Sequence, residues 1–179
     1  MNLLDAILKE INEVVSKVDE QSLADAAAYI TKERRVFVVG EGRSGLMAKG
    51  FAMRLMHLGY EVYVVGETIT PAIKENDVVV AVSGSGKSAN VVSDAKKAKE
   101  KGASVLAFTS NLESELAGSA DVSVLVPGTV RGDLGDNRTS IQLLSSLFDQ
   151  SVHIVLDGLC LYLSKRDGVS NDTATRKHW

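Results

Sequence analysis

A run of five small apolar residues, Val78 to Val82, leads directly into the loop Ser83-Gly84-Ser85-Gly86-Lys87-Ser88. A helical pattern follows over residues 89–101. An uninterrupted apolar strand needs cover on both faces, as it has in a parallel sheet. The two glycines allow a tight turn and let backbone N–H groups approach a ligand closely. With three serine hydroxyls and the positive end of a helix dipole at the same place, the segment predicts a cradle for a phosphate group.

The alternation of apolar runs and helical patterns extends along the chain. Strands are expected at 36–39, 62–65, 78–82, 105–109 and 122–126, and helices between them at about 45–58, 89–101 and 112–118. Strands that alternate with helices predict an α/β fold built on a doubly wound parallel sheet. Such sheets bind ligands outside the carboxyl ends of their strands, which is where the glycine-serine loop falls.

The two ends of the chain are predicted to be helical. Residues 3–18 and 22–32 carry apolar residues at helical spacing, and residues 139–165 form the longest helical pattern. A length of 179 residues favours a single domain over residues 1–179. Helices within residues 1–32 are expected to pack on the sheet or at a subunit interface, because their apolar face is larger than a short terminal helix needs.

Composition argues against several classes of partner. The formal net charge is −3 and no long basic run is present, which argues against DNA or RNA binding. No apolar stretch reaches the roughly 18–20 residues of a membrane span. The N-terminal residues lack the basic region of a signal peptide, and the single cysteine, Cys160, fits a reducing compartment. These features predict a cytoplasmic protein.

A first glycine loop leaves a dinucleotide enzyme open. The segment Gly40-Glu41-Gly42-Arg43-Ser44-Gly45 follows the first expected strand and has the G-x-G-x-x-G spacing. Glu67, near the end of the second strand, stands where an acidic residue binds the ribose hydroxyls. Against this, a dinucleotide fold has no need for the second loop. In the other interpretation both loops serve one small phosphorylated ligand, with Ser44 on one side and Ser83 to Ser88 on the other.

Two further interpretations of the loops also stand. Ala81 to Ser88 fits a loose P-loop pattern, although the strand endings at Thr109-Ser110 and Val126-Pro127 supply no Asp for a nucleotide-bound magnesium. Either loop can also be a plain strand-helix turn with serines that cap the helix. Two glycines alternating with serines exceed what capping requires.

The chain resembles the 6-phospho-3-hexuloisomerases of the sugar isomerase (SIS) domain family. The likeness lies in Gly40 to Gly45, in Met53-Arg54-Leu55-Met56-His57-Leu58-Gly59 and in the loop Ser83 to Ser88. Further similar segments are 68–73, 107–111, 146–150 and 176–179, so the resemblance covers nearly the whole chain. It implies a flavodoxin-like, five-stranded parallel sheet flanked by helices. It also implies a homo-oligomer, commonly a tetramer built as a dimer of dimers.

The resemblance implies an isomerase that interconverts D-arabino-hex-3-ulose 6-phosphate and D-fructose 6-phosphate through an enediol. This step follows hexulose-6-phosphate synthase in the formaldehyde-fixing ribulose monophosphate pathway. No metal or organic cofactor is implied. The alternative is a non-catalytic SIS domain that only binds sugar phosphate.

The same resemblance implies roles for individual residues. Substrate and phosphate are expected to contact Arg43, Ser44, Ser83, Gly84, Ser85, Gly86, Lys87 and Ser88. The family's base is a Glu in a Leu-Phe-Glu motif, and here Asp149, one methylene shorter, holds that position. His178 matches a terminal histidine that helps to open the sugar ring or to move a proton, in a neighbouring subunit's site. The loop 129–139 departs from the family pattern, and its Arg131 and Arg138 are candidates for substrate contact or plain loop charges.

Overall fold

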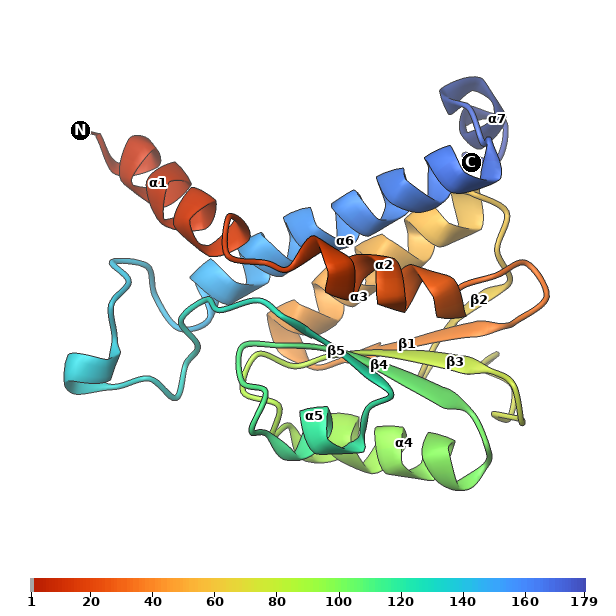
Figure 1. Cartoon of the computed structure of the whole chain (residues 1–179), viewed down its shortest axis with the longest axis horizontal. Helices are drawn as coiled ribbons and strands as arrows, with labels where there is room; N and C mark the ends of the chain where they lie inside the picture. Colours follow the sequence, from red (N-terminus) through yellow and green to blue (C-terminus); the bar gives the residue numbers. More distant parts are fainter. Residues whose placement is uncertain (1) are drawn as a thin grey trace.

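The computed structural model describes residues 2–179, so Met1 of the predicted domain lies outside the described residues. Five parallel strands form one sheet in the order β2-β1-β3-β4-β5 (Figure 1). Their bounds are β1 Val36–Gly40, β2 Val62–Val64, β3 Val78–Val82, β4 Ser104–Thr109 and β5 Val122–Leu125. This strand order is the flavodoxin-like one, in which the direction of winding reverses between β1 and β3. The predicted α/β fold with a doubly wound parallel sheet is confirmed.

Helices cover both faces of the sheet (Figure 1). One face carries α1, α2, α3 and α6, and the other carries α4 and α5. A short 3₁₀ helix, η1, lies in the loop before α6, and α7 follows α6. The bounds are α1 Leu3–Val15, α2 Glu20–Tyr29, α3 Gly42–His57, α4 Ala89–Glu100, α5 Glu115–Ser119, η1 Gly135–Asn137, α6 Ser146–Asp167 and α7 Asn171–Thr175.

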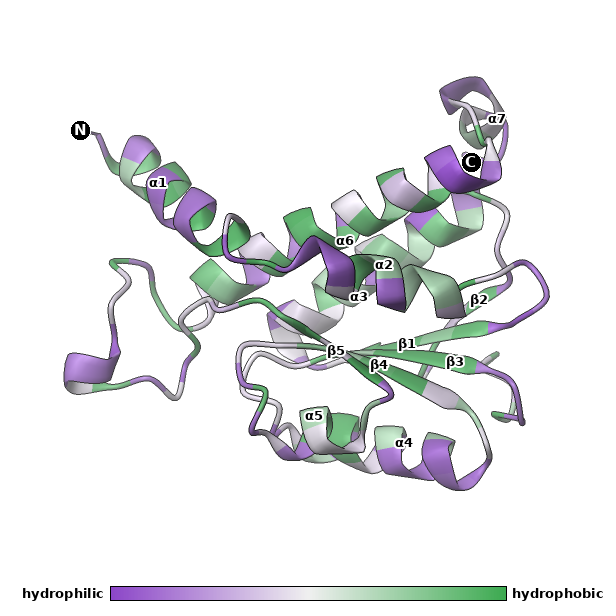
Figure 2. Ribbon diagram, in the orientation of Figure 1, coloured by the Kyte–Doolittle hydropathy of each residue, from purple (hydrophilic) through white to green (hydrophobic). Residues whose placement is uncertain are grey.

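The central strand β3 is buried along its whole length. Its side chains alternate between the two faces, so Val78, Val80 and Val82 enter one core while Val79 and Ala81 enter the other. Figure 2 shows the strands as an apolar layer between helices of mixed polarity. The burial of both faces accounts for the uninterrupted apolar run in the sequence.

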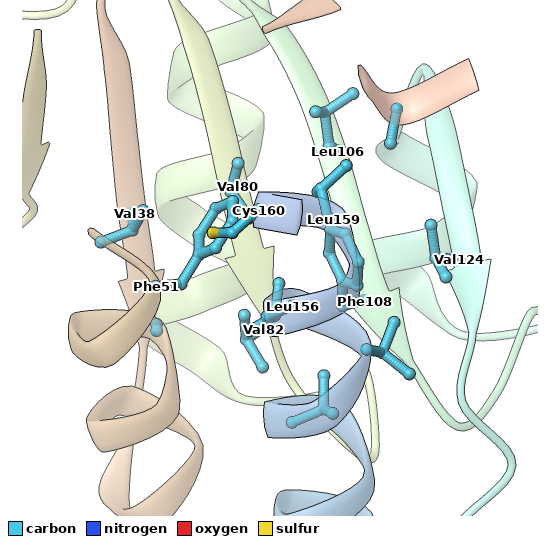
Figure 3. Close-up of a cluster of buried hydrophobic side chains, with 14 of the residues drawn as sticks. Val38, Phe51, Val80, Val82, Leu106, Phe108, Val124, Leu156, Leu159 and Cys160 are labelled. Atoms are coloured by element: carbon cyan, nitrogen blue, oxygen red, sulfur yellow. The ribbon is translucent and has the colours of Figure 1, made fainter. Parts of the chain in front are cut away.

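The larger core lies between the sheet and the pair of helices α3 and α6 (Figure 3). Val80 and Leu106 project from the strands into this core, and Phe51 projects from α3 towards Val80. Leu159 and Cys160 reach the same core from α6. This packing fixes α6 across the sheet and thereby fixes where its first turn lies.

The N-terminal helices belong to this same face. In α1, Ile11 and Val14 are buried, and the helix packs against α6. In α2, Ala26 and Ala27 are buried, and the helix packs against β5 and α6. The N-terminal part of this same apolar face of α1 is exposed, with Leu4 at 71% and Leu8 at 63% of their accessible surface.

The helix predicted over residues 139–165 begins only at Ser146, so the prediction is wrong for residues 139–145. Leu144 has a positive φ of 52°, which a helix does not admit. The segment before it is bound to side chains of other elements instead of forming helical hydrogen bonds. The apolar spacing that suggested a helix belongs in part to exposed residues, such as Ile141 at 61%.

No helix among residues 2–179 combines the length and the apolar character needed to cross a bilayer.

Replacing Leu159 by alanine tests the core between the sheet and α6. Leu159 is fully buried, so Leu159→Ala is expected to lower the free energy of unfolding by about 2–5 kcal/mol. The matched control is Leu134→Ala, because Leu134 is 73% exposed and its truncation should cost no more than about 0.5 kcal/mol. Urea denaturation of both variants measures the difference, and equal losses would contradict this packing.

Candidate functional site

The turn between β1 and α3 brings the backbone of two glycines into contact. A Cβ atom on Gly45 would lie 2.6 Å from the carbonyl oxygen of Gly40, so no larger residue fits there. Because the helix starts at Gly42, the second half of the predicted glycine loop is helical. Arg43 and Ser44 therefore lie in the first turn of α3, at the carboxyl end of β1.

The glycine-serine loop after β3 is closed by its own serines. The hydroxyls of Ser83 and Ser88 lie 2.9 Å apart, and the N–H of Gly86 donates to Ser83 Oγ at 3.1 Å. The N–H of Lys87 donates to Ser85 Oγ, also at 3.1 Å. Gly86 has a φ of 66°, and a Cβ atom there would collide with the Ser114 side chain. The loop thus depends on glycine at this position.

The two glycine-containing turns lie side by side at the carboxyl edge of the sheet. They follow β1 and β3, which are adjacent, and the strand order reverses between them. The two helix N-termini are linked here, because Asn90 Nδ2 donates to Glu41 Oε1 at 2.5 Å. Ser88 makes no side-chain cap hydrogen bond to the first turn of α4, which leaves that turn suited to an anion.

The first turn of α6 lies directly against the ends of the strands. A Cβ atom on Gly128 would lie 2.7 Å from Phe148 Cα, and one on Gly84 would lie 3.0 Å from Phe148 Cδ1. Phe148 is fully buried in the space that these glycines leave. This contact places Asp149, the next residue, between α6 and α3.

Asp149 is 2% exposed, and its carboxylate accepts a 2.5 Å hydrogen bond from Ser44 Oγ. Burial raises the pKa of Asp149 above its ordinary value of 3.8, while the Ser44 hydrogen bond and the Arg43 charge act in the opposite direction. Arg43 itself donates to Ser146 Oγ at 2.9 Å, so both residues of α3 bind the start of α6. The structure therefore brings three of the predicted site residues together.

A cavity of about 510 Å³ opens beside these residues. Ser85 and Lys87 line it, but Arg43, Ser44 and Asp149 do not. Its other lining residues come from the segments after β4 and β5, and they are Ser110, Asn111, Pro127, Gly128, Thr129, Val130, Gly132, Asp133, Asn137 and Thr139. Ser110 and Asn111 were not among the predicted site residues, although their place just after the fourth strand marks the carboxyl edge of the sheet.

His178 lies apart from the other candidates within one chain. Its ring stacks on His57, the last residue of α3, with centroids 5.4 Å apart. Ser44 is in the first turn of α3, roughly 20 Å of helix away at ~1.5 Å per residue. Figure 1 likewise shows the C-terminus near the last turns of α6, at the opposite end of this helix from its first turn.

Two candidates in the loop before α6 have structural partners. Arg138 donates to the backbone carbonyls of Val130, Asp133, Gln142 and Leu144, so it holds the loop together. Arg131 is exposed, and its N–H donates to Ser145 Oγ at 2.9 Å. Among residues 2–179, no cluster of three or more His, Cys, Asp and Glu residues is arranged to hold a metal ion.

Comparison with known proteins gives consistent matches. The SIS domain family matches residues 29–151. The chain is 42% identical to the 3-hexulose-6-phosphate isomerase of Mycobacterium gastri, covering 88% of this chain and 79% of that protein. It is 36% identical to the enzyme of the same name from Bacillus subtilis strain 168, covering 96% and 93%. A crystal structure from Methanococcus jannaschii, for which the function of 3-hexulose-6-phosphate isomerase was inferred, superposes with a TM-score of 0.80 at 28% identity and covers 98% and 97%.

Replacing Asp149 by asparagine is expected to stabilise the protein at neutral pH. Because the pKa of Asp149 is higher in the folded protein than in the unfolded chain, the folded protein binds this proton more tightly. The free energy of unfolding of the wild type therefore falls as the pH rises from 3.8 through the raised pKa of the folded state. Asp149→Asn removes this loss and should raise Tm at pH 7. The gain should shrink as the pH falls towards 3.8.

The matched control is Asp157→Asn on the same helix, where the side chain is 60% exposed and a change in Tm is not expected. Thermal unfolding at several pH values measures both variants. A gain for Asp149→Asn that is independent of pH would contradict a raised pKa at this carboxyl group.

Proposed function

The chain belongs to the SIS domain family, and we propose that it is a sugar-phosphate isomerase that interconverts D-arabino-hex-3-ulose 6-phosphate and D-fructose 6-phosphate. Relatives named 3-hexulose-6-phosphate isomerase, 36% and 42% identical over most of this chain, support the substrate class. The single observation that carries the proposal is the buried carboxylate of Asp149, which accepts a hydrogen bond from Ser44. It lies beside the glycine-serine loop, where the direction of winding of the sheet reverses between β1 and β3.

In the proposed reaction the loop Ser83 to Ser88 and the N-terminus of α4 hold the phosphate. The hydroxyls of Ser83, Ser85 and Ser88 and the backbone N–H groups of Gly84, Gly86 and Lys87 are the donors. Binding the phosphate away from the reacting carbons fixes the position of C2 and C3 without involving the phosphate in chemistry. Lys87 adds a positive charge at the edge of the cavity.

Asp149 is the proposed base. It takes the proton from C2 of the 3-ketose, the electron pair forms the C2–C3 double bond, and O3 gains a proton to give the enediol. Loss of the O2 proton and return of a proton to C3 then give the 2-ketose. The step is redox-neutral within the substrate, because C2 is oxidised as C3 is reduced. A raised pKa strengthens Asp149 as a base at neutral pH.

The proposal extends to a homo-oligomer, a tetramer built as a dimer of dimers, in which His178 of one copy serves the site of another. The position of His178 at the far end of α3 from Ser44 supports this arrangement. Exposed apolar side chains on α1 and α6, such as Leu4 and Leu161, suit contact between copies.

The proposed setting is the formaldehyde-fixing ribulose monophosphate pathway, after hexulose-6-phosphate synthase. We place the enzyme in the cytoplasm, because Cys160 is a free, buried thiol that suits a reducing compartment.

The second candidate is a protein that binds sugar phosphate without turnover. It is favoured by the burial of Asp149, which does not line the cavity. The glycine-serine loop would serve both functions equally well. The two candidates therefore differ only in whether the carboxylate reaches the substrate.

A coupled assay separates the two candidates. Hexulose-6-phosphate synthase, formaldehyde and ribulose 5-phosphate generate the substrate, and fructose 6-phosphate is measured. Asp149→Asn is expected to lower kcat by about 10²–10⁴-fold, since it removes the base. In the wild type, kcat/KM should fall at acid pH, with an apparent pKa above 3.8, because protonation of Asp149 abolishes the base.

Asp157→Asn, exposed on the same helix, should leave the rate unchanged. Fructose 6-phosphate that binds to the wild type without any turnover would reject the isomerase and support the second candidate.

Mixing two inactive variants tests the shared site. Asp149→Asn and His178→Ala chains, unfolded together and refolded as mixed oligomers, should regain part of the wild-type rate if His178 acts across subunits. Each variant refolded alone is the control. No recovery in verified mixed oligomers would contradict a contribution of His178 from another copy.

A further inference from the structure

The segment between β5 and α6 forms the outer wall of the cavity. Residues of its longer first part, from Pro127 to Thr139, line the cavity, and its shorter last part, residues 140–145, leads into α6 (Figure 1). Apart from the three-residue η1 it has no regular secondary structure. Its position therefore depends on side-chain hydrogen bonds.

Glu10 supplies three of these hydrogen bonds from α1. Its Oε1 accepts from the backbone N–H of Ile141 at 2.8 Å. Its Oε2 accepts from Ser140 Oγ at 2.7 Å and from Gln142 Nε2 at 2.9 Å. One carboxylate thus binds three consecutive residues of the wall.

The contact continues from Gln142 into α6. The amide of Gln150 donates to Gln142 Oε1 and, at 3.0 Å, to the carbonyl oxygen of Ser146. Gln150 is adjacent to Asp149, and Ser146 Oγ is the acceptor for Arg43. A chain of hydrogen bonds therefore runs from α1 to the first turn of α6, where the proposed base lies.

Arg138 holds the same wall from within. It donates to the carbonyl oxygens of Gln142 and Leu144 on one side and of Val130 and Asp133 on the other. Burial acts to raise the pKa of Glu10, but the hydrogen bonds from Gln142, Ile141 and Ser140, with a contribution from the Arg138 charge, lower this pKa overall. The carboxylate form is the one that this environment stabilises.

We propose that Glu10 is a positioning residue, which fixes the cavity wall and the first turn of α6 through residues 140–142. The proposed effect on turnover rests on the isomerase activity, whereas the effect on the wall does not. No Glu10 atom lines the cavity, so its action passes through the loop. A glutamine at this position keeps the shape of the side chain but replaces one carboxylate oxygen by an NH₂ group. This NH₂ group is a donor, so the hydrogen bonds that the replaced oxygen accepts are lost.

The kinetic test compares Glu10→Gln with Glu13→Gln. Glu13 lies one turn further along α1, is 58% exposed and faces only Lys9, at 4.0 Å. We expect Glu10→Gln to lower kcat/KM by about ten- to a hundredfold, because a displacement of the site by ~1 Å has that effect. Glu13→Gln should match the wild type. Glu10→Asp, which keeps both acceptor oxygens, should recover part of the loss.

The second readout is limited trypsin digestion of the folded protein. In the wild type, Arg138 is half-buried and bonded to four carbonyl groups, so cleavage after it should be slow. Glu10→Gln should speed cleavage after Arg138 by about tenfold or more, identified by fragment mass, while Glu13→Gln should not. Circular dichroism confirms that each variant is folded.

The outcomes separate the two proposals. If folded Glu10→Gln has the wild-type kcat/KM and the wild-type rate of cleavage after Arg138, the positioning role is overturned. This holds even if the variant has lost thermal stability. Faster cleavage in a protein whose wild type has no isomerase activity would retain Glu10 as the residue that holds the wall and reject the isomerase. Equal effects of Glu10→Gln and Glu13→Gln would also overturn the proposal.

Discussion

The close contact between Phe148 and two glycines sets the geometry of the whole site. Gly84 follows β3 and Gly128 follows β5, and neither position has room for a Cβ atom beside Phe148. Because α6 is also held across the sheet by its long apolar face, the helix has one place in which its first turn fits. Asp149, Ser44 and Arg43 meet as a result of that fit. The arrangement of the candidate site is thus a consequence of packing at the strand ends.

The same packing creates a cost in stability. Asp149 is a buried carboxylate at the contact between α3 and α6, and the hydrogen bond from Ser44 and the charge of Arg43 offset only part of the loss of hydration. A protein selected for stability alone has no reason to keep an acidic side chain there. Its presence is therefore best understood through function, as is usual for groups with perturbed pKa values.

The sheet could be predicted from the sequence because each buried strand carries its signal locally. The apolar run of β3 and the alternation of strands and helices sufficed to predict the fold, and the glycine turns after β1 and β3 lie at the carboxyl edge of the sheet as expected. The start of α6 could not be predicted, because it depends on Glu10, 131 residues away from Ile141, and on a positive φ at Leu144. The proximity of Ser44 to Asp149 came only from the resemblance, since no local pattern reveals a contact between α3 and α6. The stacking of His178 on His57 could not be predicted, because no sequence pattern links these two residues.

The hydrogen bond between Glu10 and Ile141 joins one of the first segments of the chain to one of the last. Contacts between such distant residues close a very large loop, and contacts of this kind are associated with slow folding. During synthesis α1 leaves the ribosome long before α6, against which it packs, so its apolar face is uncovered until α6 follows. The sheet can assemble from residues 36–125 in the meantime. The cavity wall can therefore close only after residues 140–150, which Glu10 and Gln150 connect, have been synthesised.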